Sequence, residues 1–100
     1  MENDVDVEEN IEMQEDKLIQ AVLGMNREHL MVYKISTAEG LQNFGNAFEK
    51  KLGEALLLAD ITYSVRILNV FQKECVQYDW LNRIYKAKEQ ATLQEPETAA

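Results

Sequence analysis

The chain is poor in the residues from which metal and cofactor sites are usually built. Its 100 residues include one cysteine, Cys75, and one histidine, His29. A single cysteine excludes an internal disulfide and a cysteine-based zinc cluster, and a single histidine excludes a site made of several imidazoles. One proline and four glycines exclude collagen-like, proline-rich and glycine-serine linker architectures. We therefore expect neither a metal nor a cofactor.

The chain also lacks the motifs of common enzymes. Its few glycines are scattered, so no loop resembles the glycine-rich turns that cradle phosphates. Cys75 lies on an apolar stripe, where a thiol is usually buried and unreactive. His29 also falls on an apolar face and follows Glu28 directly, which is not the Glu-x-x-His spacing of a di-iron site. We expect a protein that is not an enzyme.

No apolar run is long enough to cross a membrane, and the N-terminus is acidic where an export signal needs basic residues. A single unpaired thiol suits a reducing compartment. The sequence therefore predicts a cytoplasmic protein that does not contact a membrane.

The negative charge is concentrated at one end of the chain. The net charge is −8, and residues 1–16 contain eight acids and no base. The rest of the chain is electrically balanced, so it offers no basic excess for nucleic acid, and we expect no direct nucleic-acid binding. The acidic segment predicts a solubilising terminus, and the alternative is docking against a basic protein surface.

Apolar residues recur at three- and four-residue steps through most of the chain, which predicts an all-α fold. The first helix should start near Glu8 and run into 30–35, where a short strand would have no partner strand. Ser36 and Glu39 fit a capping box, which places the start of a second helix near Thr37.

Two arrangements of these helices are open. No strong turn signal lies between Gly53 and Pro96, which favours an antiparallel hairpin with one long C-terminal helix over 38–88. The alternative is a compact three-helix bundle that turns near Asp60, with this residue as N-cap of a helix starting at Ile61.

The predicted domain organisation is simple. Residues 1–7 form an acidic disordered arm, residues 8–89 a single helical domain, and residues 90–100 a disordered tail. The length of the chain allows one small domain, which buries a modest share of its surface.

The apolar seam over residues 61–85 is the strongest candidate for a functional surface. Its spacing is close to that of a coiled coil, and a long helix would leave its second half uncovered. The predicted interface residues are Leu68, Phe71, Cys75, Tyr78, Trp80, Leu81 and Tyr85.

These observations predict a non-enzymatic helical interaction module, such as an adaptor, a small regulatory subunit or a dedicated chaperone. It would form a homodimer or bind a partner helix through the 61–85 seam. Arg83, Lys86 and Lys88 are expected to form a solvated helix end, and the alternative for them is contact with the acidic segment of a neighbouring subunit. The alternative is an acidic inhibitor that mimics nucleic acid and occupies a basic site on a DNA- or RNA-binding protein.

Overall fold

The computed structural model describes the backbone of residues 2–99 and the side chains of residues 11–91. Five α-helices and no strand occur in this part of the chain. In chain order the helices are α1 (Glu2–Leu23), α2 (Arg27–Phe44), α3 (Ala47–Leu58), α4 (Ile61–Val70) and α5 (Gln72–Ala99). The all-α fold class is confirmed, and residues 30–35 belong to α2 and not to a strand.

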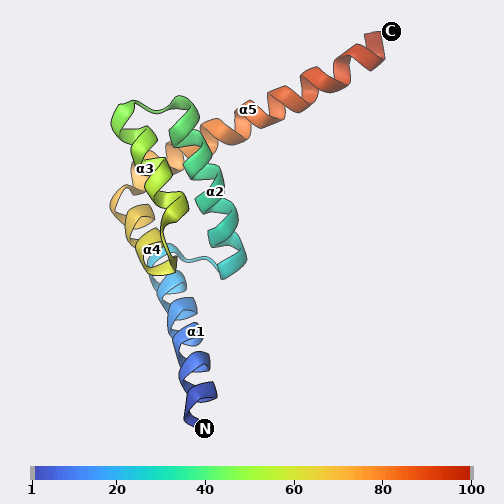
Figure 1. Cartoon of the computed structure of the whole chain (residues 1–100). Helices are drawn as coiled ribbons and strands as arrows, with labels where there is room; N and C mark the ends of the chain where they lie inside the picture. The colour runs from blue at the N-terminus through green and yellow to red at the C-terminus, as the bar shows by residue number, and fades with distance from the viewer. Residues whose placement is uncertain (1, 100) are drawn as a thin grey trace.

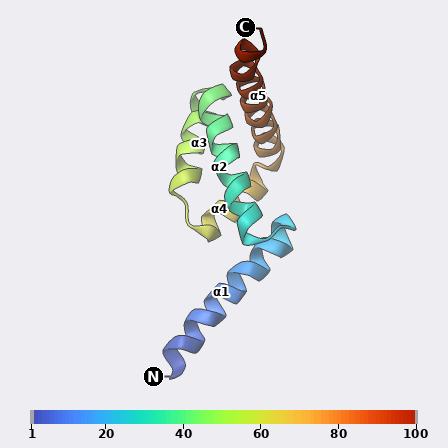
Figure 2. The ribbon, with the colours of Figure 1, turned by 90° about the vertical axis from the view of Figure 1, so that its right-hand side faces the viewer.

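The molecule is elongated. α2, α3, α4 and the first half of α5 pack together, while α1 and the second half of α5 project from opposite ends (Figures 1 and 2). The radius of gyration is 17.4 Å and the molecule measures 65 × 32 × 21 Å. A compact domain of this length would have a radius of gyration of about 13 Å. Both projecting helices therefore lie mostly outside the packed body.

The predicted arm (1–7) and tail (90–100) lie at the ends of these projecting helices. The side chains of residues 1–10 and 92–100 lie outside the described residues. The division of the chain into arm, domain and tail therefore stays a prediction.

The first helix ends earlier than its apolar pattern suggests. Gly24 has a φ of +68°, a left-handed conformation that glycine adopts without steric cost, and its amide bonds to the Gln20 carbonyl at 3.0 Å. α2 then starts after Asn26, whose side chain accepts a hydrogen bond from the His29 amide at 2.8 Å. Gly24 is thus the end of a helix and not a kink inside one.

The second helix boundary lies later than predicted. Asn46 and Glu49 form the capping box, in which each side chain bonds to the other residue's backbone amide, at 2.8 and 2.9 Å. Ser36 and Glu39, predicted for this role, lie inside α2 and bond to Asn82 of α5. The predicted capping box is wrong because these two side chains make contacts between helices.

The chain turns at Asp60. Its side chain accepts a hydrogen bond from the Tyr63 amide at 2.9 Å, so it caps α4 as the bundle alternative predicts. Lys34 donates to the Ala59 carbonyl at 2.7 Å, which satisfies an unpaired carbonyl at the end of α3. The long C-terminal helix over 38–88, on which the predicted hairpin depends, is therefore wrong.

All five helices contribute to one core. α2 lies between α3 and α5, and α1 contacts α4 through its C-terminal half. The buried cluster consists of Ile19, Leu30, Ala38, Leu56, Val65, Leu68 and Cys75. Burial of these side chains holds α4 against α1 and the first half of α5 against α2.

α2 and α5 approach most closely at Gly40. A Cβ atom on this residue would overlap the backbone carbonyl of Tyr78. Because the obstacle is backbone, it cannot rotate away as a flexible side chain would. Glycine at this position is therefore a requirement of the crossing.

Gly40→Ala tests this crossing. Overpacking at such a contact costs about 1–3 kcal/mol or more, against a gain of about 1 kcal/mol in helix propensity, so we expect a net loss of unfolding free energy. Urea denaturation measures the change, with Asn43→Ala on the exposed side of α2 as control. An unchanged or increased stability of Gly40→Ala would contradict the close approach.

Candidate interaction surface

The seven predicted interface residues fall into three groups. Leu68 and Cys75 are completely buried in the chain's own core. Phe71, Tyr78 and Leu81 are half-buried, and Trp80 and Tyr85 are exposed. The structure therefore leaves only part of the 61–85 seam available to another molecule.

The inclusion of Leu68 and Cys75 among the interface residues is wrong. The turn at Asp60 brings α4 back against the other helices and places Leu68 in the buried cluster. Thr37 of α2 covers the start of α5, where its hydroxyl donates to the Cys75 carbonyl at 3.5 Å. The apolar side chains that would have needed a second chain are covered by the first.

Three aromatic residues of the seam pack mainly on their own chain. The centres of the Phe71 and Phe48 rings lie 6.0 Å apart. The Tyr85 and Phe44 rings pack edge to face, with 5.6 Å between their centres. The Tyr78 hydroxyl donates to Glu49 at 2.8 Å. This hydrogen bond to a carboxylate raises the pKa of Tyr78.

The opposite side of α5 carries apolar residues that no other helix covers. They recur at steps of three and four residues, which places them on one face, turned away from α2. We call this face the α5 stripe; its members are Val76, Trp80, Ile84, Ala87 and Ala91. Trp80 is 63% exposed and Val76 52% exposed, whereas Ile84 is half-buried.

A second exposed surface lies between α2 and α5. Two adjoining hollows of about 350 and 340 Å³ share Val32 and Arg83 in their walls. We call them together the α2–α5 groove; it is lined by Met25, His29, Val32, Tyr33, Ile35, Ser36, Asn82, Arg83 and Lys86. Its floor is apolar and its α5 side carries two cations.

A polar network lies beside this groove. The Asn82 side-chain amide donates to Glu39 at 3.1 Å and to Ser36 at 3.4 Å, and Lys86 pairs with Glu39 at 2.7 Å. The bond to Lys86 lowers the pKa of Glu39, the bond from Asn82 adds to this effect, and burial opposes it. The Oδ1 atom of Asn82 is buried and has no hydrogen-bond partner.

The lowered pKa of Glu39 predicts a pH dependence of stability. Since the folded-state pKa lies below the ordinary value of 4.5, the stabilisation is complete above that value and is lost as the pH falls through the folded-state pKa. Glu39→Gln should therefore flatten the acid side of the stability curve measured by urea denaturation. Glu54→Gln, on an exposed pair with Lys51, is the control and should leave that slope unchanged. Equal acid slopes for wild type and Glu39→Gln would contradict the assignment.

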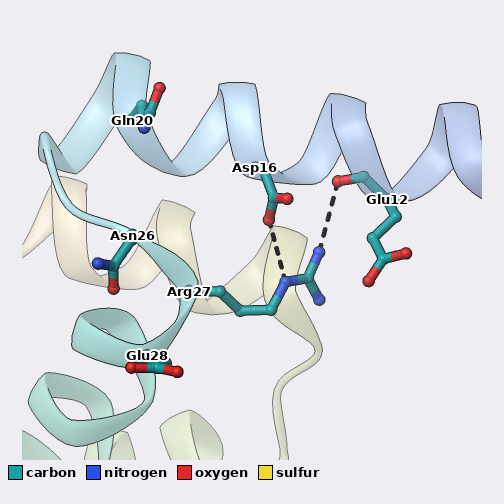
Figure 3. Close-up of a pocket in the computed structure, with 6 residues that line it drawn as sticks. All are labelled: Glu12, Asp16, Gln20, Asn26, Arg27 and Glu28. Atoms are coloured by element: carbon teal, nitrogen blue, oxygen red, sulfur yellow. Dashed lines mark hydrogen bonds and ion pairs between the residues drawn. The ribbon is translucent and has the colours of Figure 1, made fainter.

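The junction of α1 and α2 is held by one arginine. Arg27 pairs with Asp16 and Glu15, each at 3.0 Å, and donates to the Glu12 carbonyl at 3.5 Å. Figure 3 shows the guanidinium reaching across to α1, and these bonds raise the pKa of Arg27. Two acids of the N-terminal segment are thus bound to the chain's own arginine.

An apolar hollow also lies where α3 meets α4. It has a volume of about 510 Å³ and is lined by Ala55, Leu58, Ala59, Asp60, Tyr63 and Ile67. Leu58 is almost fully exposed, and the Arg66 guanidinium lies 5.7 Å from the centre of the Tyr63 ring. Asp60 and Tyr63 are the polar residues of its lining, and the Asp60 carboxylate already accepts the capping hydrogen bond of α4.

Cys75 and His29 lie in different environments. Burial raises the pKa of the Cys75 thiol to about 12, so it is protonated and shielded from solvent. His29 is exposed at the α2–α5 groove. Within the described side chains, no three His, Cys, Asp or Glu residues come together as metal ligands.

Two further findings concern the chain as a whole. No helix in its described part has the length and apolar character needed to span a bilayer. No family model, curated protein or solved structure matches the chain. The interpretation of its surfaces therefore rests on their own geometry and chemistry.

The state of Cys75 is directly testable. In the native protein near pH 8, we expect a thiol-specific reagent such as Ellman's reagent to react far more slowly than with the urea-unfolded chain, because the reactive thiolate is scarce and buried. The absorbance of the released product measures both rates. Equal rates would place the thiol at the surface and restore it as a candidate interface residue.

Proposed function

We propose that the protein is a non-enzymatic helical interaction module that self-associates through the α5 stripe. An adaptor, a small regulatory subunit and a dedicated chaperone all use such surfaces. Trp80 belongs both to the 61–85 seam predicted from the sequence and to the α5 stripe. Leu68 and Cys75 of the seam are buried, so they are not part of the proposed contact.

The exposure of Trp80 is the observation that carries this proposal. It is the chain's single tryptophan, it is 63% exposed, and Val76 lies one helical turn before it on the same face. Tryptophan is enriched among the residues that dominate binding energies, because it combines a large apolar area with few rotatable bonds. Leaving it in water forgoes about 1.5–3 kcal/mol of burial energy.

The shape of α5 supports helix-on-helix binding. The stripe from Val76 to Ala91 extends about 22 Å along the helix at 1.5 Å per residue. The second half of α5 stands clear of the body, so another helix has room to lie along it (Figure 1). The same face on two copies forms a two-fold symmetric contact in which each tryptophan packs against the partner's stripe. A helix of another protein with the same apolar spacing would satisfy the same surface.

Trp80→Glu tests the proposal. Losing an anchor worth about 2 kcal/mol or more should weaken self-association at least about 30-fold. Sedimentation velocity over a concentration series measures the dissociation constant. Asn69→Glu introduces the same charge on an exposed position of α4 and should self-associate as the wild type does.

Circular dichroism checks that both variants fold, which is expected because neither position is in the buried cluster. A wild-type chain that is monomeric throughout the series would overturn the proposal. Self-association of Trp80→Glu with unchanged affinity would show that the α5 stripe is not the contact.

A further inference from the structure

We infer that the α2–α5 groove receives the acidic N-terminal half of α1 from a second copy of the chain. This inference rests on self-association as proposed above, but it assigns a separate surface and a defined occupant. Each copy would donate one helix and accept one. The observations that carry it are the cationic rim of the groove, the acidic charge of α1, and the direction in which α1 leaves the body.

The groove has the shape of a seat for a helix. Its wall on α2 extends from His29 to Ser36, which is about 10 Å at 1.5 Å per residue. Val32 and Ile35 are exposed along this wall. Apolar residues on one helix face, flanked by polar groups on a neighbouring helix, are the usual features of a groove that binds an amphipathic helix.

The electrostatics of the rim favour an acidic occupant. Arg83 pairs with Asp79 through Nε only, at 2.9 Å, and Lys86 pairs with Glu39. The cations are the outer members of both pairs: Arg83 and Lys86 are 54% and 56% exposed, whereas Asp79 and Glu39 are 15% and 34% exposed. A helix entering the groove therefore meets positive charge first, and salt should screen this attraction because the two cations are exposed.

The N-terminal half of α1 has the complementary properties. Residues 2–12 include six acids and no base, and Ile11 and the following Met13 are both about half exposed. It projects from the body without covering by another helix (Figure 2). A helix of this length is marginally stable in water unless its apolar residues are packed.

The same copy cannot fill its own groove. The turn at Gly24 and the bonds from Arg27 to Asp16 and Glu15 direct α1 away from α2. However, the C-terminal end of α1 at Leu23 is two residues from Met25, where the groove begins. Two copies related by a two-fold axis can therefore exchange their N-terminal helices, each α1 lying in the other's groove.

Intermolecular disulfide formation tests this exchange. An affinity-tagged full-length chain with Ile11→Cys is mixed with an untagged chain carrying Val32→Cys, oxidised, and the 11–32 link between tagged and untagged chains is quantified by mass spectrometry. The matched control replaces Val32→Cys by Asn69→Cys on the exposed side of α4. We expect the 11–32 link to exceed the 11–69 link about tenfold or more, because docking raises the effective concentration of the two thiols.

Charge dependence separates this contact from apolar association alone. Arg83→Gln with Lys86→Gln should reduce the 11–32 yield several-fold, as should raising NaCl from about 0.05 to about 0.5 M. The salt series uses the folded chain without these two changes, so the test does not depend on the stability of the double variant.

The 11–32 link and Trp80-dependent self-association test the groove and the α5 stripe separately. A Trp80-dependent dimer that gives no 11–32 link above the control overturns the groove assignment and leaves the proposed function standing. A chain that is monomeric and unlinked overturns both. A strong 11–32 link in Trp80→Glu supports helix exchange while showing that the α5 stripe is not the main contact.

Discussion

The close crossing of α2 and α5 is the constraint on which the other features depend. Gly40 lets the Tyr78 backbone lie directly against α2, and this contact holds the first half of α5 in place. Cys75, one turn earlier, is then buried, and Trp80, which points to the opposite side, is left exposed. The same crossing brings Arg83 and Lys86 beside Val32 and so creates the α2–α5 groove. One packing contact thus determines which side chains of α5 stabilise the chain and which are available to another molecule.

The chain has more helix than its core can cover. The buried cluster is small, and both end helices project from it (Figure 1). In a domain of this size the buried surface gives modest stability, and association with another chain is a common way to increase it. Exposed apolar faces on projecting helices are therefore consistent with contacts between molecules. The acidic α1 and the cationic rim of the groove carry opposite charges, which would favour such a contact.

The sequence predicts the helical class and one helix start correctly because these depend on local physics. Asp60 caps α4 as its side-chain chemistry requires. The same rule misplaces the capping box, because Ser36–Glu39 and Asn46–Glu49 both fit the pattern and only the second pair has a free helix end beside it. Leu68 and Cys75 were assigned to an interface because apolar spacing identifies a buried face without identifying the neighbour that buries it. The groove was missed since Val32 and Arg83 are distant in sequence and meet only when α2 and α5 cross.

If these exposed faces bring two copies of the chain together, the mass of the unmodified protein in solution must depend on its concentration. Light scattering coupled to size exclusion measures this mass over a range of micromolar concentrations. We expect a mass that rises with concentration toward twice the 11.5 kDa of one chain. A mass of 11.5 kDa at every concentration would contradict it.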